Sequence, residues 1–337
     1  MAGKKTRAFP TAMDKKRGRS DATSSAGCSR SIRRRWNSPP PLSTPSPSSR
    51  FSDLPSDVLM RLAASFDVPT LWAASMACQS WREALRPLRE AMVLLRKGKE
   101  YKHGRGRGIA RPNPSRALEY FLKGTARGSA LAMVDAGLMY WEMGRKEEAK
   151  SLYRKSAELG YPVGQCNLGV CYLEAEQPKL EEAVKLFYRA AEAGYAPAQY
   201  NLALCLHKGR GVKCDMKNAG KWYLRAAEGG NVRAMYNTSL CYSTGEGLRR
   251  NIQQARIWMK HAADGGHRKA QYEHALNLYA SGDMMEVFVY LELATRAGVT
   301  YAAHIRDNVR QLLPQSSLDN AISRVENWQP SQFHLAT

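Results

Sequence analysis

A glycine recurs along the chain at intervals of 32 to 36 residues, and this period constrains the fold more than any other feature. The series comprises Gly128, Gly160, Gly194, Gly230, Gly266 and Gly298. A small residue, alanine or glycine, follows each of these glycines by four positions. A period of this length is typical of stacked helix pairs, in which each unit buries its apolar face only against its neighbours. The sequence therefore predicts an all-α fold built as a solenoid.

Alanines mark the second helix of each unit, and bulky side chains follow them by three or four positions. These alanines are Ala117, Ala149, Ala183, Ala219 and Ala255. The pattern predicts five units over residues 129–298, preceded by a degenerate first unit at 91–128 that has a basic, glycine-rich loop. Residues 299–337 are expected to form a C-terminal helical cap and tail, with one helix to Leu313, a stop at Pro314 and a second helix reaching Trp328.

The units resemble the Sel-like (Sel-1-like) repeat, a relative of the tetratricopeptide repeat. The resemblance is carried by stretches such as PAQYNLALCLHKGRGVKCDMKNAGKWYLRAAEGG at residues 197–230. It implies an α/α solenoid of helix pairs that serves protein binding.

The first 50 residues differ in composition from the rest of the chain. They carry 12 basic and 2 acidic side chains and are rich in serine and proline, so we expect a disordered tail. Two cationic clusters, at residues 15–19 and 33–35, resemble a bipartite nuclear import signal, but a transit peptide or a passive arm has a similar composition. Without a secretory leader or an apolar run of about 20 residues, the chain is expected in the nucleus, the cytoplasm or both, with no membrane partner.

Residues 51–90 form a short amphipathic segment between the tail and the repeats. Apolar residues at helical spacing predict a first helix that ends at Asp67-Val68-Pro69, followed by two more helices around residues 71–78 and 81–88. Three helices in fewer than about 40 residues bury little apolar surface. We therefore expect this segment to need a partner.

This segment resembles the F-box. The resemblance rests on Leu54-Pro55, Val58-Leu59, Leu62, Phe66, Leu71, Ala74-Ser75, and Cys78 with Trp81 three residues later. F-boxes dock on a small Skp-type adaptor, which joins them to a cullin and a RING protein in a ubiquitin ligase. Carried over by position, the resemblance implies that the adaptor is contacted by Leu54, Pro55, Val58, Leu59 and Leu62, and that Trp81 packs inside the module. Alternatively, these apolar residues dock on the chain's own solenoid.

An asparagine follows three of the repeat glycines by seven residues, at Asn167, Asn201 and Asn237. On the first helix of each unit these side chains would line one face, where an amide can both donate to and accept from the backbone of an extended peptide. They are the candidate substrate-binding residues. The alternative is that asparagine satisfies carbonyl groups within the scaffold.

Other motifs favour structural interpretations. Cys171, Cys205 and Cys241 each follow a repeat glycine by 11 residues, so we expect one small core residue per unit rather than a metal site, and no cofactor. The loops GRGV at 209–212 and GEGL at 245–248 join two helices instead of following a strand, which argues against a phosphate cradle. The residues after these loops, Asp215 and Asn251, and similarly Asn113, are expected to cap helices.

Eight basic residues and a single acidic one lie within residues 96–116. The basic residues are Arg96, Lys97, Lys99, Lys102, Arg105, Arg107, Arg111 and Arg116. Such a loop could hold nucleic acid phosphates, but Tyr101 alone offers a nearby aromatic ring, so contact with solvent or an acidic partner is favoured.

The sequence as a whole favours a non-catalytic, substrate-recognising subunit of a Skp-cullin-F-box ubiquitin ligase whose repeats bind a protein substrate. The resemblance to a plant group of F-box proteins with Sel-like repeats supplies the ligase part of this interpretation. The competing interpretation is a scaffold or nucleic-acid-associated repeat protein that relies on its basic tail and loop.

Overall fold

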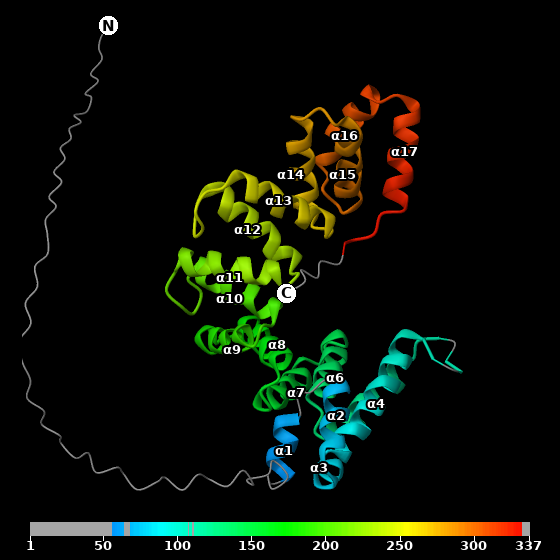
Figure 1. The fold of residues 1–337 in the computed structure, drawn as a ribbon, viewed down its shortest axis with the longest axis vertical. Coiled ribbons are helices and arrows are strands. Elements are labelled where there is room, and N and C mark those ends of the chain that lie inside the picture. The colour runs from blue at the N-terminus through cyan, green and yellow to red at the C-terminus, as the bar shows by residue number, and fades with distance from the viewer. Residues whose placement is uncertain (1–55, 64–67, 107, 110, 332–337) are drawn as a thin grey trace, which may run out of the picture. The chain divides into compact units, whose positions relative to one another are not determined.

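The structure is a computed structural model that describes residues 56–63, 68–106, 108–109 and 111–331, and within these ranges the chain forms seventeen α-helices (Figure 1). They are α1 Ser56–Ala63, α2 Val68–Ala77, α3 Gln79–Ala84, α4 Arg86–His103, α5 Pro114–Ala126, α6 Ala130–Glu142, α7 Lys146–Glu158, α8 Pro162–Leu173, α9 Leu180–Glu192, α10 Ala196–Lys208, α11 Met216–Glu228, α12 Val232–Thr244, α13 Ile252–Asp264, α14 Arg268–Tyr279, α15 Met284–Arg296, α16 Ala302–Leu312 and α17 Gln315–Glu326. The predicted all-α class is confirmed. The basic tail at 1–50, with both cationic clusters, lies outside the described residues.

The helices from α4 to α15 form consecutive pairs. The first helix of each pair packs most extensively on the second helix of the same pair, and that second helix packs on the first helix of the next pair. The predicted solenoid of helix pairs is confirmed. The pair α4 and α5 shares this arrangement, so the segment with the basic loop is folded as a repeat unit.

Within a pair, a small residue of the first helix receives a bulky side chain of the second. A Cβ atom built on Gly169 would lie 2.7 Å from Cε1 of Phe187, and one built on Gly137 would lie 2.5 Å from Cε1 of Tyr153. Such distances are well inside van der Waals contact, so these first helices have no room for a larger residue there. This close approach explains part of the repeated sequence pattern.

The six repeat glycines all lie just after a second helix and have φ angles between +78° and +87°. This left-handed conformation costs an L-residue about 1 kcal/mol or more, whereas glycine adopts it freely. It ends the second helix and turns the chain into the next unit. The glycines recur at a fixed period because each unit needs one left-handed turn at this position.

The predicted helix caps are confirmed. The side-chain oxygen of Asn113 accepts from the backbone N–H of Arg116 at 3.0 Å, and that of Asp215 accepts from Asn218 at 2.9 Å. Asn251 caps α13 in the same way at 3.1 Å. Each cap satisfies one of the N–H groups that have no partner within the helix at its start.

The front of the described chain departs from the sequence prediction in one respect. The third predicted helix, around 81–88, is split between α3 and α4, and α4 then continues without a break past residue 90, where the F-box was predicted to end. Pro87 lies in the first turn of α4, a position that proline favours, so it begins a helix instead of ending one. One helix therefore belongs to both the F-box-like segment and the first repeat.

The C-terminal cap matches its prediction. Helix α16 ends just before Pro314, and α17 buries Leu318, Ala321 and Val325 against the last repeats. Beyond α17 the chain returns to α13, where the backbone N–H of Ser331 donates to the carbonyl oxygen of Asp264 at 2.9 Å. No helix in the described ranges is both long enough and apolar enough to span a membrane.

Candidate functional site

The predicted adaptor-contacting residues differ in how much of each side chain is exposed. Leu54 and Pro55 lie outside the described residues. On α1, Val58 is half-buried, Leu59 is 2% exposed and Leu62 is 52% exposed. Of the described part of this set, Leu62 alone offers a large area to a partner.

Leu59 belongs to a core that joins the front helices to the first two repeats. The buried members of this core include Leu71 of α2, Leu88 of α4 and Phe121 of α5. Leu59 therefore packs against the chain itself and does not face outward as the F-box resemblance implied, because α1 packs on α3 and Leu59 belongs to the core that both share with the first repeats. Trp81 is half-buried against the same core, in keeping with its expected internal role.

Helix α2 is apolar on all sides. Its sequence, VPTLWAASMA, contains no charged residue. Leu71 and Ser75 face the core, and the Ser75 hydroxyl is satisfied by donating to the carbonyl oxygen of Leu71 at 2.7 Å. On the other side Trp72 is 49% and Met76 is 66% exposed, and Ala73 and Ala77 beside them are exposed as well. A helix that is apolar all round is normally buried on all sides, but no described residue covers this face of α2.

This exposed face is not among the predicted contact residues. The F-box resemblance assigned adaptor contacts to residues 54–62 only, and residues 71–78 were expected simply as a second helix. The signal is present in the ten charge-free residues of α2, since a surface helix of a soluble domain carries charges on its outer face. Because residues one turn apart share a face, Trp72 and Met76 form a single apolar stripe.

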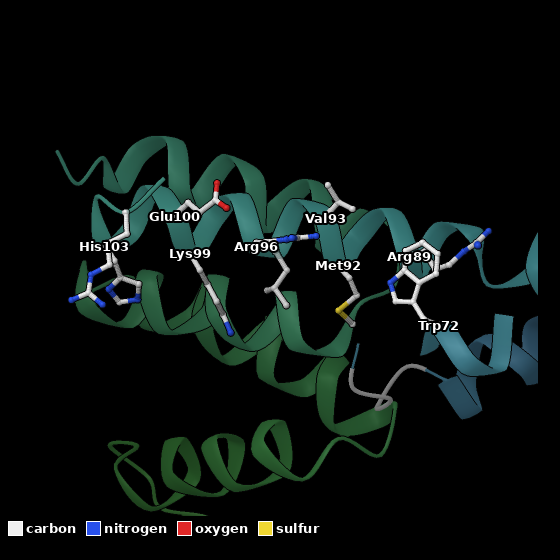
Figure 2. A pocket seen from close by; sticks show the side chains of 10 residues that line it. Trp72, Arg89, Met92, Val93, Arg96, Lys99, Glu100 and His103 are labelled. Carbon is white, nitrogen blue, oxygen red and sulfur yellow. The ribbon is translucent and has the colours of Figure 1, made fainter. Parts of the chain in front are cut away.

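A groove of about 500 Å³ runs along α4 next to this stripe. Figure 2 shows Trp72 and Arg89 at one end, His103 at the other, and Met92, Val93, Arg96, Lys99 and Glu100 along the helix between them. The Arg89 guanidinium lies 5.5 Å from the centre of the Trp72 ring and donates to the carbonyl oxygen of Arg82 at 2.9 Å. An apolar floor with a mainly cationic rim suits an amphipathic partner with acidic groups.

The predicted basic cluster is divided by the fold. Lys99 and Lys102 pair with Asp135 at 3.6 Å and Glu142 at 3.4 Å, both on α6. Lys97 and Arg116 lie over the rings of Tyr120 and Tyr101, respectively. Arg96 and Arg105 face the α4 groove, and Arg107 lies outside the described residues. Several of these cations therefore hold the first two repeats together rather than forming one phosphate-binding loop.

The three candidate asparagines are all half-buried on first helices, but the fold brings only two of them together. Asn201 lines a cavity of about 480 Å³ between α10 and the start of α12, and Asn237 lines one of about 570 Å³ between α12 and the start of α14. Both cavities include Tyr200 and Arg233, so they adjoin. Asn167 lines a separate cavity of about 100 Å³ with Trp141 and Tyr153.

We call the two adjoining cavities the asparagine groove. Its polar and aromatic lining comprises Tyr200, Asn201, Arg233, Tyr236, Asn237, His267, Arg268 and Lys269. The Tyr236 ring stacks on His267 with 4.5 Å between centroids, and its hydroxyl donates to Glu273 Oε1 at 2.7 Å. Burial, and then the positive charges of Arg233, Lys269 and Arg268, lower the pKa of His267 to about 4.

The repeated cysteines are core residues, as predicted. Cys171, Cys205 and Cys241 are buried, and burial raises the pKa of the Cys171 and Cys241 thiols to about 11. A protonated, enclosed thiol is a poor nucleophile and a poor metal ligand. Within the described ranges no three His, Cys, Asp or Glu side chains are grouped as a metal site would need.

Comparison with protein families supports the repeat assignment. The family model of the Sel1 repeat matches residues 98–129, 145–161, 162–195, 196–231 and 232–267. The first of these matches covers the end of α4 and all of α5, where the sequence alone predicted a degenerate unit.

One curated relative extends over the front helices as well. It is the F-box protein At1g70590 of Arabidopsis thaliana, which is 54% identical over 291 residues, a stretch that covers 84% of this chain and 82% of the relative.

Solved structures with a similar fold include a Sel1 repeat protein. This protein, from Oxalobacter formigenes, is 25% identical with a TM-score of 0.53, and the match covers 70% of this chain and 96% of that one. A second, c5321 of uropathogenic Escherichia coli, a protective antigen with an SLR fold, is 21% identical with a TM-score of 0.43, and the match covers 74% of this chain and 62% of that one. The first likeness agrees with the solenoid of helix pairs described above.

Proposed function

The chain belongs to the F-box proteins that carry Sel1 repeats, and from that premise we propose that it is the substrate-recognition subunit of a Skp-cullin-F-box ubiquitin ligase. In this role the front helices bind a Skp-type adaptor, which connects to a cullin and a RING protein. The repeats bind the protein that is to be ubiquitinated.

The proposed subunit is non-catalytic and acts by proximity. Holding a substrate beside a charged conjugating enzyme converts an encounter between separate molecules into a reaction within one assembly, with effective concentrations that reach the millimolar range for flexible tethers. This role needs two separate binding surfaces and no catalytic side chain. The exposed face of α2 and the asparagine groove of the repeats are the two surfaces that we assign to it.

The observation that carries the proposal is the uncovered apolar face of α2. Trp72 and Met76 expose large apolar areas on a helix without a single charge, and Leu62 does so on α1. Covering roughly 100 Å² of such surface is worth about 2.5 kcal/mol. A partner that buries all three side chains therefore gains affinity from a face that otherwise has an unfavourable contact with water.

Replacement of Met76 by glutamate tests this assignment. We expect Met76→Glu to weaken co-purification of a Skp-type adaptor with the full chain by at least about tenfold, because a carboxylate would be buried without a partner. The matched control is Leu312→Glu on α16, since Leu312 is 65% exposed, nearly the same as Met76. Helical content, measured by circular dichroism, should be unchanged in both variants.

Two results would count against the proposal. If the unaltered chain fails to retain any Skp-type adaptor, the ligase role is wrong. If Met76→Glu retains the adaptor as well as Leu312→Glu does, the α2 face is not the docking surface; the double variant Leu54→Asp with Pro55→Ala then shows whether the residues predicted from the F-box resemblance carry the interaction instead.

A further inference from the structure

The asparagine groove carries more positive charge than its surroundings neutralise. Arg233, Arg268 and Lys269 are exposed and line it, and none of them forms an ion pair with a carboxylate of the described residues. Some cations elsewhere in the repeats are paired, as Arg145 is with Glu148 at 2.7 Å and Lys260 with Asp264 at 2.8 Å. What distinguishes the groove is that three such cations line the same pair of adjoining cavities. The carboxylate that contacts a groove residue, Glu273, already accepts a hydrogen bond from Tyr236.

The backbone of the groove adds to its positive electrostatic potential. Helices α12 and α14 begin in it, so the positive ends of two helix dipoles lie beside the three cations. Burial is the main cause of the lowered pKa of His267, and the positive charges of Arg233, Lys269 and Arg268 lower it further. A groove with this charge concentrates anions.

The shape of the groove and the side-chain amides of Asn201 and Asn237 indicate what kind of anion the groove would bind. The two cavities adjoin through Tyr200 and Arg233, giving an elongated polar trough across three first helices rather than one closed pocket. The amide of Asn237 makes no hydrogen bond with a described residue, and that of Asn201 has only a long contact of 3.6 Å to Cys166 Sγ. The whole amide of Asn237 and the carbonyl oxygen of Asn201 are therefore available to pair with the N–H and C=O groups of an extended chain.

We propose that the asparagine groove binds an extended, acidic segment of the substrate protein, with its carboxylates on Arg233, Arg268 and Lys269 and its backbone on Asn201 and Asn237. This inference rests on the proposed function, because it names the chemical class of the substrate that the repeats recruit.

Two other occupants are disfavoured by the chemistry of the groove. Single-stranded nucleic acid needs aromatic faces free for base stacking, but Tyr236 is stacked on His267, and Tyr200 lies 6.0 Å from the ring of Tyr223. The chain's own first 50 residues carry 12 basic and 2 acidic side chains, so they would be repelled.

The test uses the full chain and a fluorescein-labelled peptide of alternating glutamate and serine, about twelve residues or roughly 40 Å long when extended. Binding is followed by fluorescence anisotropy over a range of salt concentrations. We expect binding that weakens with salt, and no binding of the same peptide with glutamine in place of glutamate. A phosphoserine peptide with no glutamate and a thymidine oligonucleotide are run as competitors.

The decisive variant is Arg268→Glu with Lys269→Glu. We expect it to lower the affinity for the acidic peptide by about tenfold or more, since it places two like charges against the ligand. The matched control is Arg249→Glu with Arg250→Glu, an equal change in charge at two exposed residues of the loop between α12 and α13. This control should change the affinity by less than about threefold, an effect of general charge alone.

Several outcomes would overturn the inference. They are an equal loss of peptide affinity in both variants, equal binding of the glutamine peptide, and tighter binding of the oligonucleotide or of the phosphoserine peptide. Adaptor co-purification is measured on the same samples. If the adaptor is retained while the acidic peptide fails to bind, only the groove assignment is wrong and the proposed function stands.

Discussion

The front helices and the repeats use apolar surface in opposite ways. In the repeats the bulky side chains of second helices that face a small residue or an alanine-rich core, such as Phe187 and Tyr223, are almost completely buried. In the front, α2 is as apolar as any core helix but is covered on one side only. The repeats thus complete their core internally, whereas the front helices leave an apolar face exposed. In the function proposed above, this difference divides stability and binding along the chain, since the exposed face is the one that another protein would cover.

The sharpest test of this division compares one truncation in each region. Phe187→Ala, in the core of the α8–α9 pair, should lower the free energy of unfolding by about 3 to 5 kcal/mol, because it leaves a cavity that rigid helices cannot close. Trp72→Ala should cost less than about 1 kcal/mol, mostly through loss of the contact with Arg89. Urea unfolding of both variants measures the two costs. Equal costs would mean that α2 is part of the structural core and not a binding face.

A second prediction concerns what the adaptor does to the front helices. With adaptor present at about 100 times its dissociation constant, binding stabilises the bound state by about 2.7 kcal/mol, or roughly 100-fold in exchange rate. We expect amide hydrogen exchange to slow by up to that factor in α1 and α2. Amides of α10 and α12 that exchange through local opening should change little. Uniform slowing along the chain would contradict the division into a docking region and an independent solenoid.

The smallest expected effect is a decrease in the free energy of unfolding at acidic pH, caused by two histidines of the repeats, His267 and His274. Burial lowers the pKa of both His267 and His274 to about 4, from an ordinary value of 6.5. The unfolded chain therefore binds more protons between pH 6.5 and 4, so the stability that these neutral histidines contribute is complete above pH 6.5 and is lost as the pH falls toward 4. At pH 5.5 the loss is roughly 1 kcal/mol for each histidine.

His267 has a specific reason to resist protonation. Its Nδ1 accepts from the backbone N–H of Ala270 and caps α14, and three cations surround it, whereas His274 has Asp264, Lys260 and Tyr290 as its polar neighbours. Urea unfolding at about pH 7.5 and about pH 5.5 should show a smaller difference in His267→Gln with His274→Gln than in the unaltered chain. His304→Gln, at an exposed site on α16, is the control and should leave the difference unchanged.

Most of the repeat architecture could be predicted from the sequence because each structural feature that defines a unit depends on a few neighbouring residues and recurs in the next unit. A left-handed glycine, a capping asparagine or aspartate and a small residue opposite a bulky one each leave a trace at a fixed spacing. The same period is sufficient to assign the repeated cysteines to the core, since one small buried residue per unit needs no other explanation.

The candidate sites were predicted less well, for two physical reasons. An apolar helix such as α2 has no polar face to show which side its neighbours cover, so the burial of Leu59 and the exposure of Met76 depend on how the front helices dock on the first repeats. The asparagines share a repeat position, but the cavity beside each one is set by neighbouring units. Trp141 and Tyr153 line the cavity of about 100 Å³ beside Asn167, whereas glycines and helix starts line the larger cavities beside Asn201 and Asn237.

Helix α4 connects the front helices rigidly to the repeats. Its 18 residues run from the end of the F-box-like segment into the first repeat, so no loop separates the two. A single residue inserted into an α-helix turns everything on one side of it by about 100° and shifts it by about 1.5 Å. The length of α4 thus fixes the orientation of the repeats relative to the front helices. In the proposed ligase, inserting or deleting one residue in α4 would change the direction in which the repeats hold a substrate protein.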